Sequence, residues 1–108
     1  MIRHLVFFTL RDPADLDQVR DTFATLADIP GVRGFEVGVN TRRDGASDDE
    51  PDLVVHAVLD DAAALEAYKA HPIYQRSVEV VRPLRELRIA VDYEVGGPAP
   101  PAPDQASP

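Results

Sequence analysis

The spacing of apolar residues changes along this chain in an order that few folds can accommodate. Four segments are either rich in β-branched and aromatic residues or alternate between apolar and polar residues, and helix-like spacing of three or four residues follows the first and the third of these segments. The segments that we expect to form strands are 2–9, 32–39, 53–59 and 87–95. The predicted order is therefore strand, helix, strand, strand, helix, strand.

Both predicted helices are bounded by residues that suit a helix end. The first begins at Asp12-Pro13, a capping residue followed by proline, and ends at Ile29-Pro30-Gly31. The second begins after the Asp60-Asp61 pair and is interrupted at His71-Pro72, after which residues 73–81 predict a further short helix.

This order of elements is the split βαβ motif of the ferredoxin-like folds, which belong to the α+β class. Because strand crossovers are right-handed, we expect a four-stranded antiparallel sheet ordered 4-1-3-2 with the helices on one face. The other face would also be apolar, because the first strand carries Leu5 and Phe7 on one side and Val6 and Phe8 on the other. The last strand adds an apolar face of its own, formed by Leu87, Ile89, Val91 and Tyr93.

An uncovered apolar sheet face of this size usually marks an interface. We therefore predict a homodimer in which two sheets face each other. The alternative is a monomer whose second sheet face is partly polar.

The composition excludes several classes of function. The chain has 108 residues, of which 44% are hydrophobic, so it can bury one core. It has no cysteine, which excludes disulfides, thiolate nucleophiles and zinc–thiolate sites. A formal net charge of −8 argues against a nucleic-acid partner. The local basic run of Arg82, Arg85 and Arg88 is flanked by acidic residues, and we interpret it as a solvated face.

The two ends of the chain suggest one domain with an extension. The apolar run near the N-terminus is too short for a signal peptide or a membrane span, so we expect no membrane partner and a cytoplasmic location. Residues 1–95 form the predicted domain. Residues 96–108 are rich in proline and alanine and predict a disordered tail. A polyproline II ligand in this tail is a further hypothesis.

Four stretches in this order are similar to the stress-responsive α/β-barrel (Dabb) domain family: HLVFFTLRD, IPGVRGFEVGVN, LEAYKAHPIYQ and RIAVDYEV. The resemblance covers about residues 1–95. It implies a ferredoxin-like protomer in a dimeric α+β barrel, in agreement with the argument from the sheet faces. Most bacterial members have no assigned activity, so the resemblance implies a stress-related small-molecule binding protein or a structural protein.

The chain is also distantly similar to one plant member, olivetolic acid cyclase, which closes a linear polyketide by an aldol step. The resemblance implies matches at His4, Tyr68 and Asp92-Tyr93. The cyclase has a His-Pro-x-His motif whose second histidine is the base. Here the motif is His71-Pro72-Ile73-Tyr74, so Tyr74 occupies the position of the base.

That difference has a chemical consequence. A base that removes a proton between two carbonyls works best near the operating pH, and histidine ionises at about 6.5 whereas tyrosine ionises at about 10. Cyclisation by the plant mechanism is therefore not expected. A phenol can still polarise a carbonyl by donating a hydrogen bond.

His4 and Asp92 are the strongest candidate pair, because the predicted topology brings their strand ends together. Asp92 would orient the imidazole of a general base, or the two would form only a polar pair that closes the sheet. Tyr68 is a candidate hydrogen-bond donor or a core residue. His71 is a candidate base or a helix cap. Around these residues we expect a mostly apolar ligand pocket, lined by Val6, Phe8, Phe23, Val55, Tyr68 and Tyr74.

We expect no metal site and no cofactor. His4, His56 and His71 do not have metal-ligand spacing, and His56 is expected to face the dimer barrel. The acidic loop 41–52 lacks the EF-hand pattern and predicts a mobile, solvated segment. Three functions remain: small-molecule binding without catalysis, a cofactor-independent enzyme for a carbonyl or polyketide-like substrate, and a protein-interaction module that uses the tail.

Overall fold

The computed structural model describes residues 1–43, 45 and 49–96. The elements follow the predicted order, with α2 and α3 flanking the His71-Pro72 junction. They are β1 (Ile2–Leu10), the 3-10 helix η1 (Pro13–Asp15), α1 (Leu16–Ala24), the 3-10 helix η2 (Thr25–Asp28), β2 (Gly34–Val39), β3 (Leu53–Leu59), α2 (Ala62–Ala70), α3 (Pro72–Val81) and β4 (Arg85–Glu94). The predicted disordered tail lies outside the described residues, apart from its first residue, Gly96.

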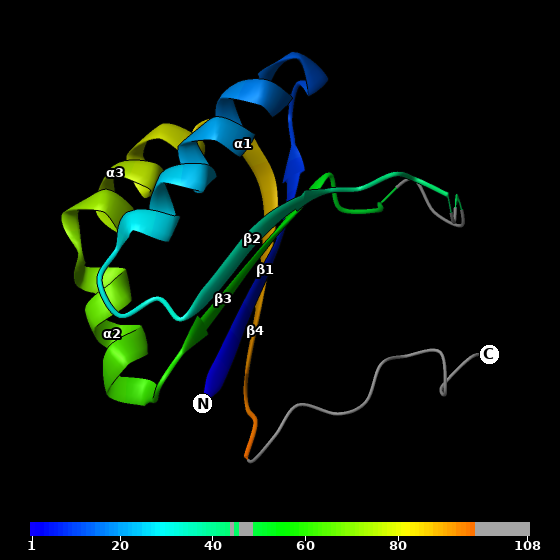
Figure 1. Ribbon diagram of the computed structural model, residues 1–108. Helices are drawn as coiled ribbons and strands as arrows, with labels where there is room; N and C mark the ends of the chain where they lie inside the picture. Colours follow the sequence, from blue (N-terminus) through cyan, green and yellow to red (C-terminus); the bar gives the residue numbers. More distant parts are fainter. Residues whose placement is uncertain (44, 46–48, 97–108) are drawn as a thin grey trace.

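The four strands form one antiparallel sheet in the order β2-β3-β1-β4, which confirms the predicted topology. β1 is central, and Val6 stands opposite Val55 of β3 and Ala90 of β4. All three α-helices lie on the same side of this sheet (Figure 1). The ferredoxin-like α+β fold that the sequence predicts is the fold of the chain.

The main differences from the predicted elements are in the first helix and at the starts of β2 and β4. The first helical segment is divided into η1, α1 and η2, and Asp12 caps η1 by accepting a hydrogen bond from the amide of Ala14. β2 begins at Gly34, because Val32 still belongs to a turn in which its amide donates to the Ile29 carbonyl. β4 begins at Arg85, which stands opposite Leu10 beyond an irregularity in the register.

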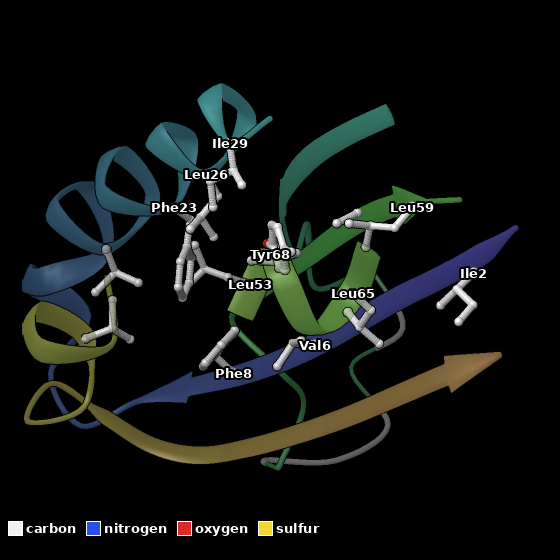
Figure 2. Close-up of a cluster of buried hydrophobic side chains, with 14 of the residues drawn as sticks. Ile2, Val6, Phe8, Phe23, Leu26, Ile29, Leu53, Leu59, Leu65 and Tyr68 are labelled. Carbon is white, nitrogen blue, oxygen red and sulfur yellow. The ribbon is translucent and has the colours of Figure 1, made fainter. Parts of the chain in front are cut away.

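The core lies between the helices and the inner face of the sheet (Figure 2). β1 shows the period of two most clearly, with the side chains at positions 2, 4, 6, 8 and 10 all buried. Phe8 packs against Phe23 of α1 with ring centroids 4.6 Å apart. Burying a side chain of this size contributes about 1.5–3 kcal/mol, so this layer supplies most of the stability.

The outer face of the sheet has no helix over it among the described residues. Leu87, Ile89, Val91 and Tyr93 of β4 are 45–50% exposed on this face. The register places Leu5 and Phe7 beside Val91 and Ile89, so the apolar surface continues onto β1. His56 is on the same face, opposite Leu5, as predicted.

The loop before β3 is fastened to the sheet at its C-terminal end. The Asp52 carboxylate accepts a 2.7 Å hydrogen bond from the Leu10 amide and contacts the Arg42 guanidinium. The predicted mobile segment includes residues 44 and 46–48, which lie outside the described part of the chain. Within the described part, no helix has the length and the apolar character needed to cross a membrane.

Candidate functional site

A cavity of about 310 Å³ lies between the sheet and the helices. Its walls come from β1, α1, η2, β3, α2, α3 and β4, and both apolar and polar side chains line them. The side chains that we expected around a pocket all lie along it: Val6, Phe8, Phe23, Val55, Tyr68 and Tyr74. Its volume is within the range of small-molecule sites.

His4 is a buried histidine at one end of this cavity. It stands directly opposite Asp92 in the β1–β4 register, and its Nδ1 contacts the Asp92 carboxylate. Only 1% of His4 is exposed, whereas 38% of the Asp92 side chain is exposed at the sheet edge. The predicted meeting of the two residues is confirmed by this contact, and their chemical role stays a prediction.

The surroundings of His4 favour a neutral imidazole. Burial lowers the pKa of His4 below its ordinary value, and the hydrogen bond and charge of Asp92 offset part of that effect. The positive charges of Lys69 and Arg88 also lower this pKa. A neutral imidazole that donates its Nδ1–H to Asp92 has an accepting lone pair on Nε2. Such a nitrogen can accept a hydrogen bond or a proton from a bound molecule.

Tyr68 places a second polar group at the same end of the cavity. Its ring meets the His4 ring edge-on, with centroids 5.9 Å apart, and the residue is 1% exposed. The hydroxyl has no hydrogen-bond partner among the described residues. Burial raises the pKa of Tyr68, with a smaller contribution from Tyr74, so the phenol keeps its proton. An unpaired buried hydroxyl is costly, so a polar partner at this position would be favourable.

Tyr74 continues this series of side chains toward the cavity mouth. Its ring centroid lies 5.2 Å from that of Tyr68, and its hydroxyl lies 3.5 Å from Nη2 of Arg88. A series of side-chain contacts therefore connects Asp92, His4, Tyr68, Tyr74 and Arg88.

Comparison with known proteins identifies the family. The family model described as the stress responsive A/B barrel domain matches residues 2–95. The chain belongs to the Dabb family.

Several known proteins resemble this chain over most of its length. An uncharacterised protein of Streptomyces coelicolor is 35% identical over 103 residues, which cover 87% of this chain and 99% of the relative. A crystal structure of a dimeric ferredoxin-like protein of unknown function from Thermobifida fusca is 28% identical, covers 87% of this chain and 90% of its own, and has a TM-score of 0.75. A Dabb family protein from Mesorhizobium loti is 26% identical, covers 89% of this chain and 97% of its own, and has a TM-score of 0.74.

The helix junction of this Dabb domain does not bring His71 into the cavity lining. The His71 Nδ1 instead accepts a 3.1 Å hydrogen bond from the Ile73 amide and caps α3. Pro72 follows at the first helical position, where its missing N–H leaves no hydrogen bond unmade. Of the four candidate catalytic residues, His4, Asp92 and Tyr68 are grouped and His71 is separate.

The charged residues of the lining were missed in the sequence, as were Leu26, Gln75, Ser77, Val78 and Val81. Arg82, Arg85 and Arg88 all lie along the cavity. Arg82 and Arg88 are exposed, in agreement with a solvated face, but the sequence did not indicate that this face borders the cavity. Arg88 stands opposite Phe8 and therefore shares the inner face of the sheet with His4 and Phe8. The alternation of β4, with apolar residues at 87, 89, 91 and 93, was the signal that places position 88 on that inner face.

Proposed function

We propose that this Dabb protein is a homodimer whose protomers each bind a small, largely apolar molecule that carries a hydrogen-bonding oxygen. The observation that carries the proposal is the unpartnered Tyr68 hydroxyl, buried at a cavity of about 310 Å³ beside His4. A phenol that keeps its proton donates to a carbonyl or hydroxyl oxygen, and Nε2 of a neutral His4 accepts from a hydroxyl.

The dimer would form through the outer face of the sheet. Four apolar side chains of β4 are about half exposed there, and solvation of such a surface is unfavourable. A second copy presents the same apolar surface, which suits a two-fold interface. The similar protein from Thermobifida fusca is described as dimeric, which supports the same assembly here.

Binding is tested by thermal stabilisation with a neutral probe, 4-butylacetophenone, in a panel with phenolic acids and fatty acids. A molecule that binds only the folded protein raises its melting temperature as concentration rises. We expect a dose-dependent rise that is lost in Val78→Phe, because Val78 lines the cavity. Val80→Phe, on the same helix and outside the lining, is the matched control. Absence of a rise with every class would refute ligand binding.

A second candidate function is a cofactor-independent enzyme that removes a proton beside a carbonyl. The contact of Asp92 with the His4 Nδ1 favours it, because a carboxylate on one ring nitrogen orients the imidazole and supports a proton taken at the other. His4 would be the base, and the Tyr68 hydroxyl would donate to the developing enolate oxygen. Tyr74 occupies the position of the base in the plant cyclase motif, so this route differs from that mechanism.

The enzyme hypothesis is tested by deuterium exchange. The protein is mixed with 1-phenylbutane-1,3-dione in D2O, and loss of the proton signal between the carbonyls is followed by NMR. We expect acceleration by the natural protein, loss in His4→Gln and partial loss in Asp92→Asn. An exchange rate equal to that of buffer alone would leave binding as the function.

A further inference from the structure

The cavity mouth carries three positive charges, and its interior carries none. Arg82 follows the last residue of α3, Arg85 is the first residue of β4, and Arg88 lies three residues further along that strand. The other side chains along the cavity are aliphatic or aromatic, apart from His4, Gln75 and Ser77, and Tyr68 and Tyr74 add hydroxyl groups. A molecule in this cavity therefore meets apolar walls inside and guanidinium groups at the entrance.

These guanidinium groups have no carboxylate partner among the residues that the structure describes. The arginines that form ion pairs within the described part of the chain are Arg20, Arg33 and Arg42. The one side-chain hydrogen bond of the three is the 3.5 Å contact from Arg88 to the Tyr74 hydroxyl. The chain has 19 acidic and 11 basic side chains, so carboxylates are abundant. The cavity mouth therefore has a local positive charge, although the net charge of the chain is negative.

From this arrangement we infer that the ligand is an apolar carboxylic acid, bound as the carboxylate, with its charged end at Arg82, Arg85 and Arg88 and its body against Phe8, Phe23 and Val81. The inference rests on the proposed binding function and names the ligand class. A guanidinium is planar and donates two parallel hydrogen bonds to a carboxylate, which neither lysine nor a neutral side chain does. Tyr68 at the inner end would bind a second oxygen of the same molecule.

The test compares molecules that share a 4-butylphenyl group and differ in the polar group attached to it. Isothermal titration of the full chain measures Kd for 4-butylbenzoate, the neutral 4-butylbenzamide and 4-butylphenyl phosphate. We expect the benzoate to bind at least about tenfold more tightly than the amide, as a charge-assisted contact implies. Raising NaCl from 50 to 500 mM should weaken the binding of the benzoate and leave the Kd of the amide unchanged, because salt screens exposed charges.

Substitution of single arginines tests whether the ligand carboxylate binds at the cavity mouth. In Arg88→Gln, and separately in Arg85→Gln, the preference for benzoate over amide should fall to less than about threefold. Arg76→Gln is the matched control, because Arg76 is an exposed residue of α3 outside the cavity lining. It should keep the full preference.

The outcomes separate this inference from the function on which it rests. Equal Kd values for benzoate and amide in the natural protein would overturn the anion assignment while ligand binding stands. Tighter binding of the phosphate than of the benzoate would overturn the choice of carboxylate. No binding of any of the three heads, or of 4-butylacetophenone, would overturn the inference together with the proposed function.

Discussion

Asp92 of β4 lies opposite His4 of β1, and its carboxylate contacts Nδ1 of an imidazole that is almost completely buried. The pair joins an exposed edge strand to the central strand at one end of the cavity. Asp92 is partly exposed and His4 is buried, so a charge at the surface affects the protonation of a residue in the core.

The burial of His4 predicts a pH dependence of stability. Its folded-state pKa lies below the value of about 6.5 in the unfolded chain, so the unfolded chain takes up a proton that the folded chain does not. Stability is therefore fully present above about pH 7 and falls as the pH drops from about 6.5 through the folded-state pKa, by at most about 1.4 kcal/mol per pH unit. Urea unfolding at pH 7.5, 6.5 and 5.5, at one protein concentration, measures this slope.

The His4→Gln variant should flatten that slope. His56→Gln controls for loss of an imidazole outside the pair, because His56 lies on the outer face of the sheet. If His4→Gln and the natural protein lose stability equally between pH 7.5 and 5.5, the prediction is wrong.

Removal of the Tyr68 hydroxyl should separate stability from binding. The hydroxyl has no partner among the described residues, so Tyr68→Phe should leave the free energy of unfolding unchanged or raise it by up to about 1 kcal/mol. Affinity for 4-butylacetophenone should fall by about fivefold, since one hydrogen bond is lost. Tyr93→Phe, on the outer face, is the control for both measurements. A stability loss of more than about 2 kcal/mol would mean that the hydroxyl is satisfied within the folded chain.

The capping role of His71 predicts that its substitution changes stability and not proton exchange. His71→Ala should cost about 1 kcal/mol of unfolding free energy, whereas His71→Asn should cost little, because asparagine is a good N-cap. Proton exchange on 1-phenylbutane-1,3-dione should be equal in the natural protein and in His71→Asn. A large loss of exchange in His71→Asn would instead make His71 a base.

The outer sheet face predicts the oligomeric state. Val91→Glu places a charge in the centre of the exposed apolar surface and should convert the dimer into a monomer, as measured by light scattering after size-exclusion chromatography. Glu94→Lys changes a charge on the inner face of the same strand and should remain dimeric. A monomeric natural protein, or a dimeric Val91→Glu, would place the interface elsewhere.

Much of the fold follows from apolar spacing alone. The strand order and the single helical layer were predictable, because the strand and helix segments differ clearly in composition and spacing and right-handed connections leave few topologies. The meeting of His4 with Asp92 followed from the same topology. The start of β4 was not predictable, because Arg85 and Glu86 are charged and resemble a loop, whereas hydrogen bonding to β1 extends the strand through them.

The candidate site was predicted less completely than the fold. Its apolar lining followed from the inner faces of β1 and β3. The arginine mouth was missed because neighbouring acidic residues suggested mutual pairing in solvent, while the structure pairs none of the described ones with Arg82, Arg85 or Arg88. The role of His71 was open because a helix cap and a catalytic base have the same sequence requirement here, a polar side chain before proline.

The two faces of β4 border different surroundings, the outer sheet face and the cavity side. Its odd-numbered side chains, from Leu87 to Tyr93, form the exposed apolar face, and its even-numbered side chains include Arg88 and Asp92. A strand moves as a unit, so association of two protomers and occupancy of each cavity would act on the same backbone. Thermodynamic linkage then requires reciprocity: if pairing of the subunits tightens the hold on a ligand, the ligand must tighten the pairing of the subunits by the same factor.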